Sequence, residues 1–182
     1  MFRSYQYVGP QELWHALEDS PSGTVIKSST DVISWIKNYK QEVSPDGLYW
    51  VTYTMLVSGE LCIADRHSEH VACASGGPVL AAGELAFDIA LKSSQAKRNI
   101  KSDGDKVKII EASNQSTGFC PEPDCWKAVK HALKGTGIIY PNELTYIVCF
   151  RLCNHCNQRN IVKDNYFVCS CCGEELPKEW NF

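Results

Sequence analysis

Two pairs of cysteines near the end of the chain constrain its structure more than any other feature. Cys153 pairs with Cys156 and Cys169 with Cys172, so twelve residues separate two C-x-x-C motifs. Two residues between thiols allow one tight turn to direct both sulfurs to a single point, and two such turns complete the tetrahedral shell that Zn²⁺ prefers. Gly173 follows the second pair, where a backbone with positive φ is often needed. The spacing predicts one zinc ion held by four thiolates.

This zinc site is predicted to be structural. Because all four ligands are cysteines, no coordination position is left for water or substrate. Cys149 and Cys171 lie close enough in sequence to compete for the metal, but only the pairing of Cys169 with Cys172 leaves two residues between thiols. His155 is expected at the surface. A module this small has too little apolar core to fold alone, so the metal supplies its folding free energy.

Composition sets the broad class. A chain of 182 residues, with 44% hydrophobic and 21% charged residues, has room for one ordinary core and a small satellite. The net charge of −3 gives no reason to expect a polyanion partner. No apolar run approaches the roughly 18 residues of a membrane span, and the first residues lack the apolar stretch of a signal peptide. Ten cysteines without such a signal are typical of a reducing compartment, so we expect a cytoplasmic protein with no membrane association.

Hydrophobic periodicity predicts an α+β fold with a mostly antiparallel sheet, about three helices and a small C-terminal zinc ribbon. The chain is expected to divide into an α+β domain over residues 1–143 and a ribbon over residues 144–182. Thr30 and Asp124 are the expected helix caps, and Trp14 and Trp126 are expected to face inward. The predicted helices are 10–18, 30–42 and 125–134, the predicted strands are 24–27, 48–57, 60–65, 69–74, 78–87, 107–112 and 144–152, and 92–106 is a predicted polar loop.

The charges of the predicted ribbon argue against nucleic-acid binding. Four basic residues and four acidic residues cancel between positions 151 and 182, so the footprint of a phosphate-binding surface is missing. The loop 92–106 carries an excess of Lys and Arg, but a solvated loop is the simpler interpretation. A role in protein interaction, or in stapling the chain together, therefore suits the ribbon better.

A second group of polar residues falls at the ends of, or inside, apolar strand segments. Apolar residues, Ala and Leu among them, lie on both sides of Glu84, and a carboxylate in such surroundings is costly unless His67, His70 or Arg66 from the neighbouring strand pairs with it. A perturbed pKa of that kind is typical of general acids and bases. The alternative is a buried polar network that fixes strand register. The candidate catalytic residues are His67, His70, Glu84, Asn114 and Ser116.

Two further metal-dependent hypotheses use other residues. A zinc deaminase needs H-x-E followed by P-C-x-x-C, but Ala82 precedes Glu84 where His is needed, and four residues separate Cys120 from Cys125. We reject the deaminase as the first choice and keep it as a minor alternative. A second metal site formed by His67, His70, Cys73, Cys120 and Cys125 is left open, although an extended segment over 69–74 would place its members on opposite faces.

Several motifs resemble a family of uncharacterised bacterial proteins. They are Ser-Glu-His-Val-Ala-Cys-Ala at 68–74, Ala-Ala-Gly-Glu at 81–84, Asn-Gln-Ser-Thr-Gly-Phe-Cys-Pro at 114–121 and the tail Leu-Pro-Lys-Glu-Trp-Asn. The resemblance implies a bacterial source but no activity. The C-terminal module separately resembles the zinc-ribbon class, which implies the metal role of its four cysteines.

Two functional hypotheses follow. The first is a zinc-binding interaction or ligand-binding module, with a protein as the expected partner and a small molecule or nucleotide as the open alternative. The second is an enzyme, a hydrolase or transferase that acts on a nucleotide or a protein side chain through the candidate catalytic residues. The two differ in whether those side chains converge beneath an open pocket.

Overall fold

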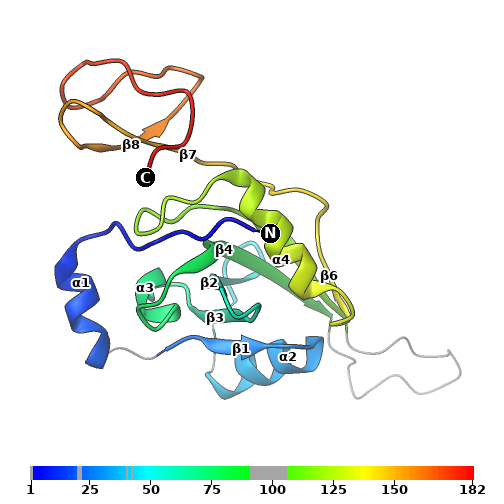
Figure 1. Ribbon diagram of the computed structural model, residues 1–182. Coiled ribbons are helices and arrows are strands. Elements are labelled where there is room, and N and C mark those ends of the chain that lie inside the picture. The colour runs from blue at the N-terminus through cyan, green and yellow to red at the C-terminus, as the bar shows by residue number, and fades with distance from the viewer. Residues whose placement is uncertain (1, 20–21, 40, 42, 91–105) are drawn as a thin grey trace, which may run out of the picture.

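The computed structural model describes residues 2–19, 22–39, 41, 43–90 and 106–182. Its main element is a six-stranded sheet in the order β1-β3-β2-β4-β5-β6, in which only β5 and β6 are parallel (Figure 1). The α+β class with a mostly antiparallel sheet is confirmed. The strands are β1 Thr24–Ile26, β2 Tyr49–Leu56, β3 Leu61–Asp65, β4 Val79–Ala90, β5 Lys106–Ala112 and β6 Ile138–Ile139.

Helices cover both faces of this sheet. The α-helices of the described ranges are α1 Gln11–His15, α2 Ser29–Asn38, α3 His70–Cys73 and α4 Trp126–Leu133, and the 3₁₀ helices are η1 Ala16–Asp19 and η2 Pro123–Cys125. Alternate residues of β2, among them Val51 and Tyr53, are buried on the face where the apolar sides of α2 and α4 complete the main core. The Tyr53 hydroxyl donates a hydrogen bond to the Ser113 carbonyl at 3.0 Å, which ties the middle of β2 to the segment after β5.

The opposite face of β2 carries threonines in place of large apolar residues. The Thr52 hydroxyl donates to backbone carbonyls in the turn after β3, and the Thr54 hydroxyl donates to the sulfur of Cys73 at 3.4 Å. Helix α3 therefore lies directly on this face of the sheet. The predicted strand over 69–74 is wrong, because Cys73 and Ala74 donate to the carbonyls four residues earlier. A short apolar run fits either period, and packing against the sheet selects the helix.

The helix caps and the exposure of Trp14 also differ from those predicted. Ser28, and not Thr30, caps α2, because its hydroxyl accepts a hydrogen bond from the Asp31 amide. Asp124 lies within η2 and makes no cap. Trp14 is 46% exposed, in contrast to the buried Trp126. The predicted loop 92–106 falls outside the described residues except for its last residue, which begins β5.

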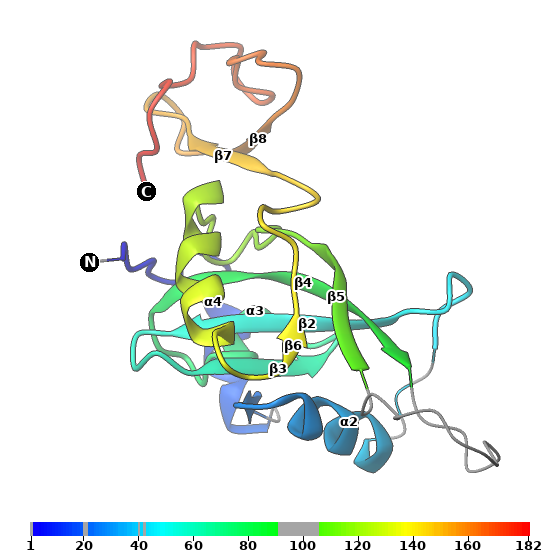
Figure 2. The same ribbon diagram turned by 90° about the vertical axis from the view of Figure 1, so that its right-hand side faces the viewer.

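A small second sheet follows at the C-terminal end. Strands β7 Cys149–Leu152 and β8 Arg159–Val162 pair antiparallel. Figure 2 shows the chain leaving β6, running along the larger sheet and entering β7. The predicted strand over 144–152 forms only from Cys149 onward, because the residues before it hydrogen-bond to the end of β5 and the segment that follows. The domain boundary at residue 143 stays a prediction.

Candidate metal centre and sheet groove

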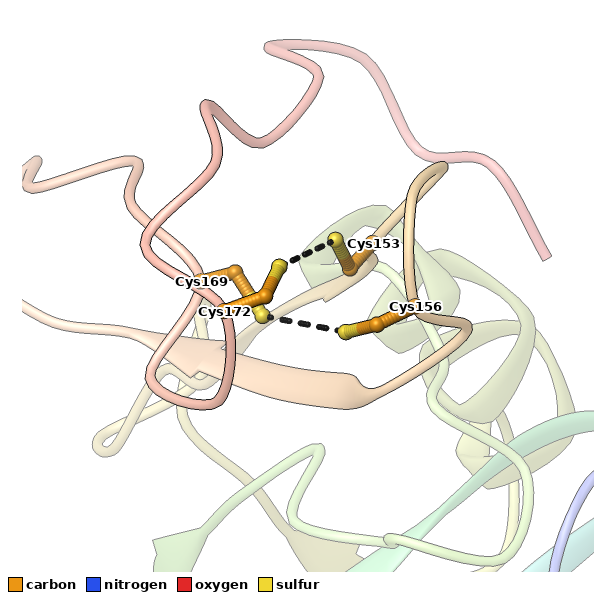
Figure 3. Close-up of side chains that lie close together, drawn as sticks. All are labelled: Cys153, Cys156, Cys169 and Cys172. Carbon is orange, nitrogen blue, oxygen red and sulfur yellow. Dashed lines mark hydrogen bonds between the residues drawn. The ribbon is translucent and has the colours of Figure 1, made fainter.

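The four cysteines of the two C-x-x-C motifs meet beside the small sheet, with their sulfurs facing one another (Figure 3). The sulfurs of Cys153 and Cys172 are 3.6 Å apart, as are those of Cys156 and Cys169, and all four lie within 4.8 Å. Metal–sulfur bonds of about 2.3 Å in a tetrahedron place the sulfurs about 3.8 Å apart. The four thiols therefore have the geometry of a metal centre. Among the residues that the structure describes, it is the only group of this kind.

Two equivalent turns build this centre. In the first, Asn157 donates its amide hydrogen to the Cys153 carbonyl, and the Cys153 amide donates to the Gln158 carbonyl. In the second, Gly173 donates its amide hydrogen to the Cys169 carbonyl, and the Cys169 amide donates to the Glu174 carbonyl. Each turn needs one residue in the left-handed region, with φ of 58° at Asn157 and 78° at Gly173. The role predicted for Gly173 is thus matched in the first turn by Asn, the other residue type that tolerates this conformation.

Asn160 on β8 joins the two turns. Its side-chain amide donates to the Gln158 carbonyl at 2.8 Å and to the sulfur of Cys169 at 3.5 Å, while its oxygen accepts from the amide and hydroxyl of Ser170. Backbone N–H groups of Cys172 and Cys171 also point at Cys169 and lower the pKa of its thiol to about 6. Such donors stabilise a thiolate, which is the form that binds metal. No pattern in the sequence singles out Asn160.

One buried arginine attaches the small sheet to the α+β part of the chain. Arg151 is 7% exposed, and its guanidinium donates to the carbonyls of Phe150 and Lys178 and to the Glu122 carboxylate at 3.2 Å. A buried charge is tolerated because several acceptors surround it. A second arginine, Arg159, donates to the Thr117 carbonyl at 2.8 Å.

The last residues of the chain form a strap over this junction. The Asn181 side chain exchanges two hydrogen bonds with the backbone of Leu152 and so continues the pairing of β7. The Trp180 indole donates to the Cys120 carbonyl at 2.8 Å, and its ring packs edge-on against Tyr5. The tail that follows the four cysteines therefore contacts β7, the N-terminal segment and the segment after β5.

Within the described part of the chain, the five candidate catalytic residues do not contact one another through hydrogen bonds or ion pairs. Asn114 is fully buried, and its side chain bonds to the backbone of Pro121 and Val148, which fixes the entry into β7. Ser116 is buried with no hydrogen-bond partner for its hydroxyl in the described residues. The enzyme hypothesis stays a prediction.

The two histidines differ in environment. The His67 side chain is 91% exposed, and its ring lies 3.2 Å from the Asp65 carboxylate. His70 begins α3, and its ring Nε2 lies 3.0 Å from the Gly83 carbonyl, which requires the proton on Nε2. Although His70 is partly exposed as a residue, its imidazole is enclosed, and this burial lowers its pKa to about 4. His70 is therefore neutral near pH 7 and acts as a hydrogen-bond donor between α3 and β4.

Glu84 lies on the open part of the sheet face that α3 leaves uncovered. Its neighbours there are Trp50, which is diagonal to it across β2 and β4, and Glu111 on β5. Two neighbouring cavities, of about 450 and 140 Å³, lie at this place and share Trp50 and Arg66 in their linings. We call the two cavities together the sheet groove. The smaller cavity is lined by Trp50, Arg66, Glu84, Glu111, Ala112, Ser113, Gln115, Thr145 and Tyr146, and the larger one by Tyr39, Gln41, Val43, Ser44, Pro45, Trp50, Asp65, Arg66 and His67.

Arg66 lines both cavities of the sheet groove. Its guanidinium carbon lies 4.7 Å from the centre of the Trp50 ring, and its Nε is 3.9 Å from a Glu84 oxygen. Of the three partners that the sequence left open for Glu84, His67, His70 and Arg66, the structure places Arg66 beside it. Glu111 accepts a hydrogen bond from the Thr145 hydroxyl. Sequence reasoning missed Trp50 and Glu111; their positions at alternate places on their strands were the available signal.

The second metal site left open by the sequence has no counterpart among the described residues. The Cys73 sulfur donates to the Cys62 carbonyl, and that of Cys120 to the Thr117 carbonyl. Burial raises the pKa of both thiols, Cys73 and Cys120, to about 12. All ten cysteines are free thiols.

Comparison with known proteins found no matching family model and no significantly similar curated protein or solved structure. Among the residues that the structure describes, no helix is long and apolar enough to cross a membrane.

Proposed function

We propose that this chain is a zinc-stapled interaction protein, in which the metal centre is structural and the sheet groove binds a protein partner. The observation that carries the first half is the near-tetrahedral set of four sulfurs, with 3.6 Å between the members of each closest pair. Four thiolates suit Zn²⁺ and leave it no open position for chemistry. The tail that the metal holds supports a fixed scaffold, because Arg151 and Trp180 both contact the α+β part.

The structural role of the metal is tested by exchanging cysteines inside and outside the centre. Cys153→Ser removes a fully buried ligand, and we expect loss of about one zinc per chain and a lower melting temperature. Cys171→Ser is the matched control, because Cys171 is exposed and lies between two ligands without belonging to the four. Metal analysis and thermal unfolding measure both effects. Equal metal loss in the two variants, or an unchanged melting curve after full chelation, would contradict the proposal.

The charge and apolar surface of the sheet groove support a basic protein segment as the occupant. Three carboxylates line the groove, those of Asp65, Glu84 and Glu111, against one guanidinium, that of Arg66. Such a surplus of negative charge favours a cationic side chain. Exposed apolar residues lie along the same groove, with Tyr39 61%, Val43 54% and Tyr146 57% exposed. We infer that a Lys or Arg flanked by apolar residues is bound here, with its cation beside the Glu84 and Glu111 carboxylates and its apolar neighbours against the exposed rings of the groove.

A displayed library of random linear peptides tests this part of the proposal. Selection on the intact protein is expected to recover peptides with Lys or Arg next to an apolar residue. Trp50→Ala and Glu84→Gln should each weaken binding about tenfold, as expected for interface anchors. Glu179→Gln is the control, because Glu179 is exposed on the tail and lines neither cavity. Recovery of neutral or acidic peptides, or binding that survives Trp50→Ala, would refute the groove as the binding surface.

The proposal also places the protein in a reducing, cytoplasmic setting. Thiolate ligands persist where disulfides are rare, and the exposed Cys171 would otherwise be open to oxidation. Membership of a bacterial family stays a prediction from the sequence motifs.

A further inference from the structure

A separate cleft lies where the N-terminal segment and α1 meet the turn after α3. Its volume is about 410 Å³, within the range of roughly 300–1,000 Å³ typical of small-molecule sites. Helix α1 stands at the edge of the molecule beside α3 (Figure 1), so the cleft shares no lining residue with the sheet groove. The lining residues that matter chemically are Gln6, Tyr7, Gln11, Trp14, His15 and Gly76.

The aromatic rings of this cleft are held in place through their polar atoms. The Trp14 indole N–H donates to the Gly76 carbonyl at 3.3 Å, yet the residue is 46% exposed. Gly76 allows this approach, because its φ is 77° and a Cβ there would lie 3.3 Å from the indole nitrogen. The Tyr7 hydroxyl donates to the Pro10 carbonyl at 3.0 Å. The indole N–H and the phenol O–H are thus used inside the protein, and apolar ring surface is left for a ligand.

The remaining polar side chains of the cleft are the amides of Gln6 and Gln11 and the imidazole of His15, whose ring packs edge-on against Trp14. The side chains of Gln6 and Gln11 are exposed, and neither makes a hydrogen bond within the described part of the chain. Each amide both donates and accepts. No Asp, Glu, Lys or Arg lines the cleft, and the charges that act on the nearby Tyr7 hydroxyl come from Glu69, Arg159 and Glu12 outside it.

These properties favour one class of ligand over another. A polyproline peptide offers carbonyl acceptors and needs the indole and phenol donors, which Trp14 and Tyr7 already spend on the backbone. A sugar offers hydroxyl groups that both donate and accept, together with an apolar C–H face. We propose that this cleft binds a neutral carbohydrate, with one sugar ring stacked on Trp14 and its hydroxyl groups bonded to the amides of Gln6 and Gln11.

The test is a titration followed by ¹H–¹⁵N NMR, with maltose, cellobiose and diacetylchitobiose as the probes. The Trp14 indole signal is assigned by its absence from Trp14→Phe. We expect at least one of these disaccharides to shift that signal in a saturable way. Trp14→Ala and Gln11→Ala should each weaken binding about tenfold or more, since each removes a direct contact. Trp50→Ala, which alters the sheet groove alone, should leave sugar binding unchanged.

Folding of the variants is checked by thermal unfolding. Helix α1 contains no buried residue, so Trp14→Ala is expected to fold. Gln6→Ala, at an exposed position, provides a second variant in which weaker sugar binding is expected without any loss of packing. Absence of a saturable shift at tens of millimolar of every sugar, or sugar binding that survives Trp14→Ala, would overturn the proposal. A shift caused by a proline-rich peptide and by none of the sugars would do the same.

Discussion

The enclosed imidazole of His70 makes the stability of this protein depend on pH in a defined window. The folded-state pKa of His70 is about 4, against 6.5 for an unperturbed histidine, because burial disfavours the charged ring. Between these values the unfolded chain binds a proton at His70 and the folded chain does not. The free energy of unfolding therefore falls as pH drops from 6.5 to 4, and this contribution is constant above 6.5. A pKa difference of about 2.5 corresponds to a loss of at most about 3 kcal/mol.

The assay must separate His70 from the metal centre, whose thiols also take up protons as pH falls. We therefore compare urea unfolding of the natural chain with that of His70→Gln between pH 4.5 and 7.5. Glutamine keeps an N–H donor for the Gly83 carbonyl but does not titrate. The difference in unfolding free energy between the two proteins should change by about 1 kcal/mol or more per pH unit below pH 6. A flat difference, or an NMR titration of His70 with a pKa near 6.5, would refute the buried neutral imidazole.

Three further predictions concern packing and the metal centre. Trp126→Ala should lower the unfolding free energy by about 3–5 kcal/mol in urea unfolding, because the side chain is buried and its indole donates to Pro141; a loss within error would show that the α4 face is misassigned. Gly83→Ala should cost about 3 kcal/mol or more, because the new Cβ would lie 2.1 Å from the Ser113 carbonyl oxygen. Gly77→Ala, where the nearest atom is 3.5 Å away, should be nearly neutral in the same assay, and equal losses would disprove the clash. Asn160→Ala should weaken zinc binding about 10–100-fold in a chelator competition, since it removes hydrogen bonds to both cysteine turns; unchanged affinity would exclude that role.

Local patterns carried most of the successful predictions. The strands of the hairpin β2–β3 and the helix face of α4 followed from period and turn residues, and these are read within a few neighbouring positions. The errors concern segments whose state depends on contacts from elsewhere. Helix α3 forms where a strand was predicted, because Thr54 and Gly83 of the sheet provide partners for Cys73 and His70.

The four ligands of the candidate metal centre could be predicted from the sequence alone, because each C-x-x-C turn fixes its two sulfurs through the backbone of five consecutive residues. The docking of the small sheet on the rest of the chain could not be predicted, because Arg151 bonds to Glu122 and Lys178 only after distant segments have come together. The sheet groove likewise depends on tertiary structure: β2 and β4 are not joined by a hairpin turn, and the register of their pairing places Trp50 and Glu84 on one face.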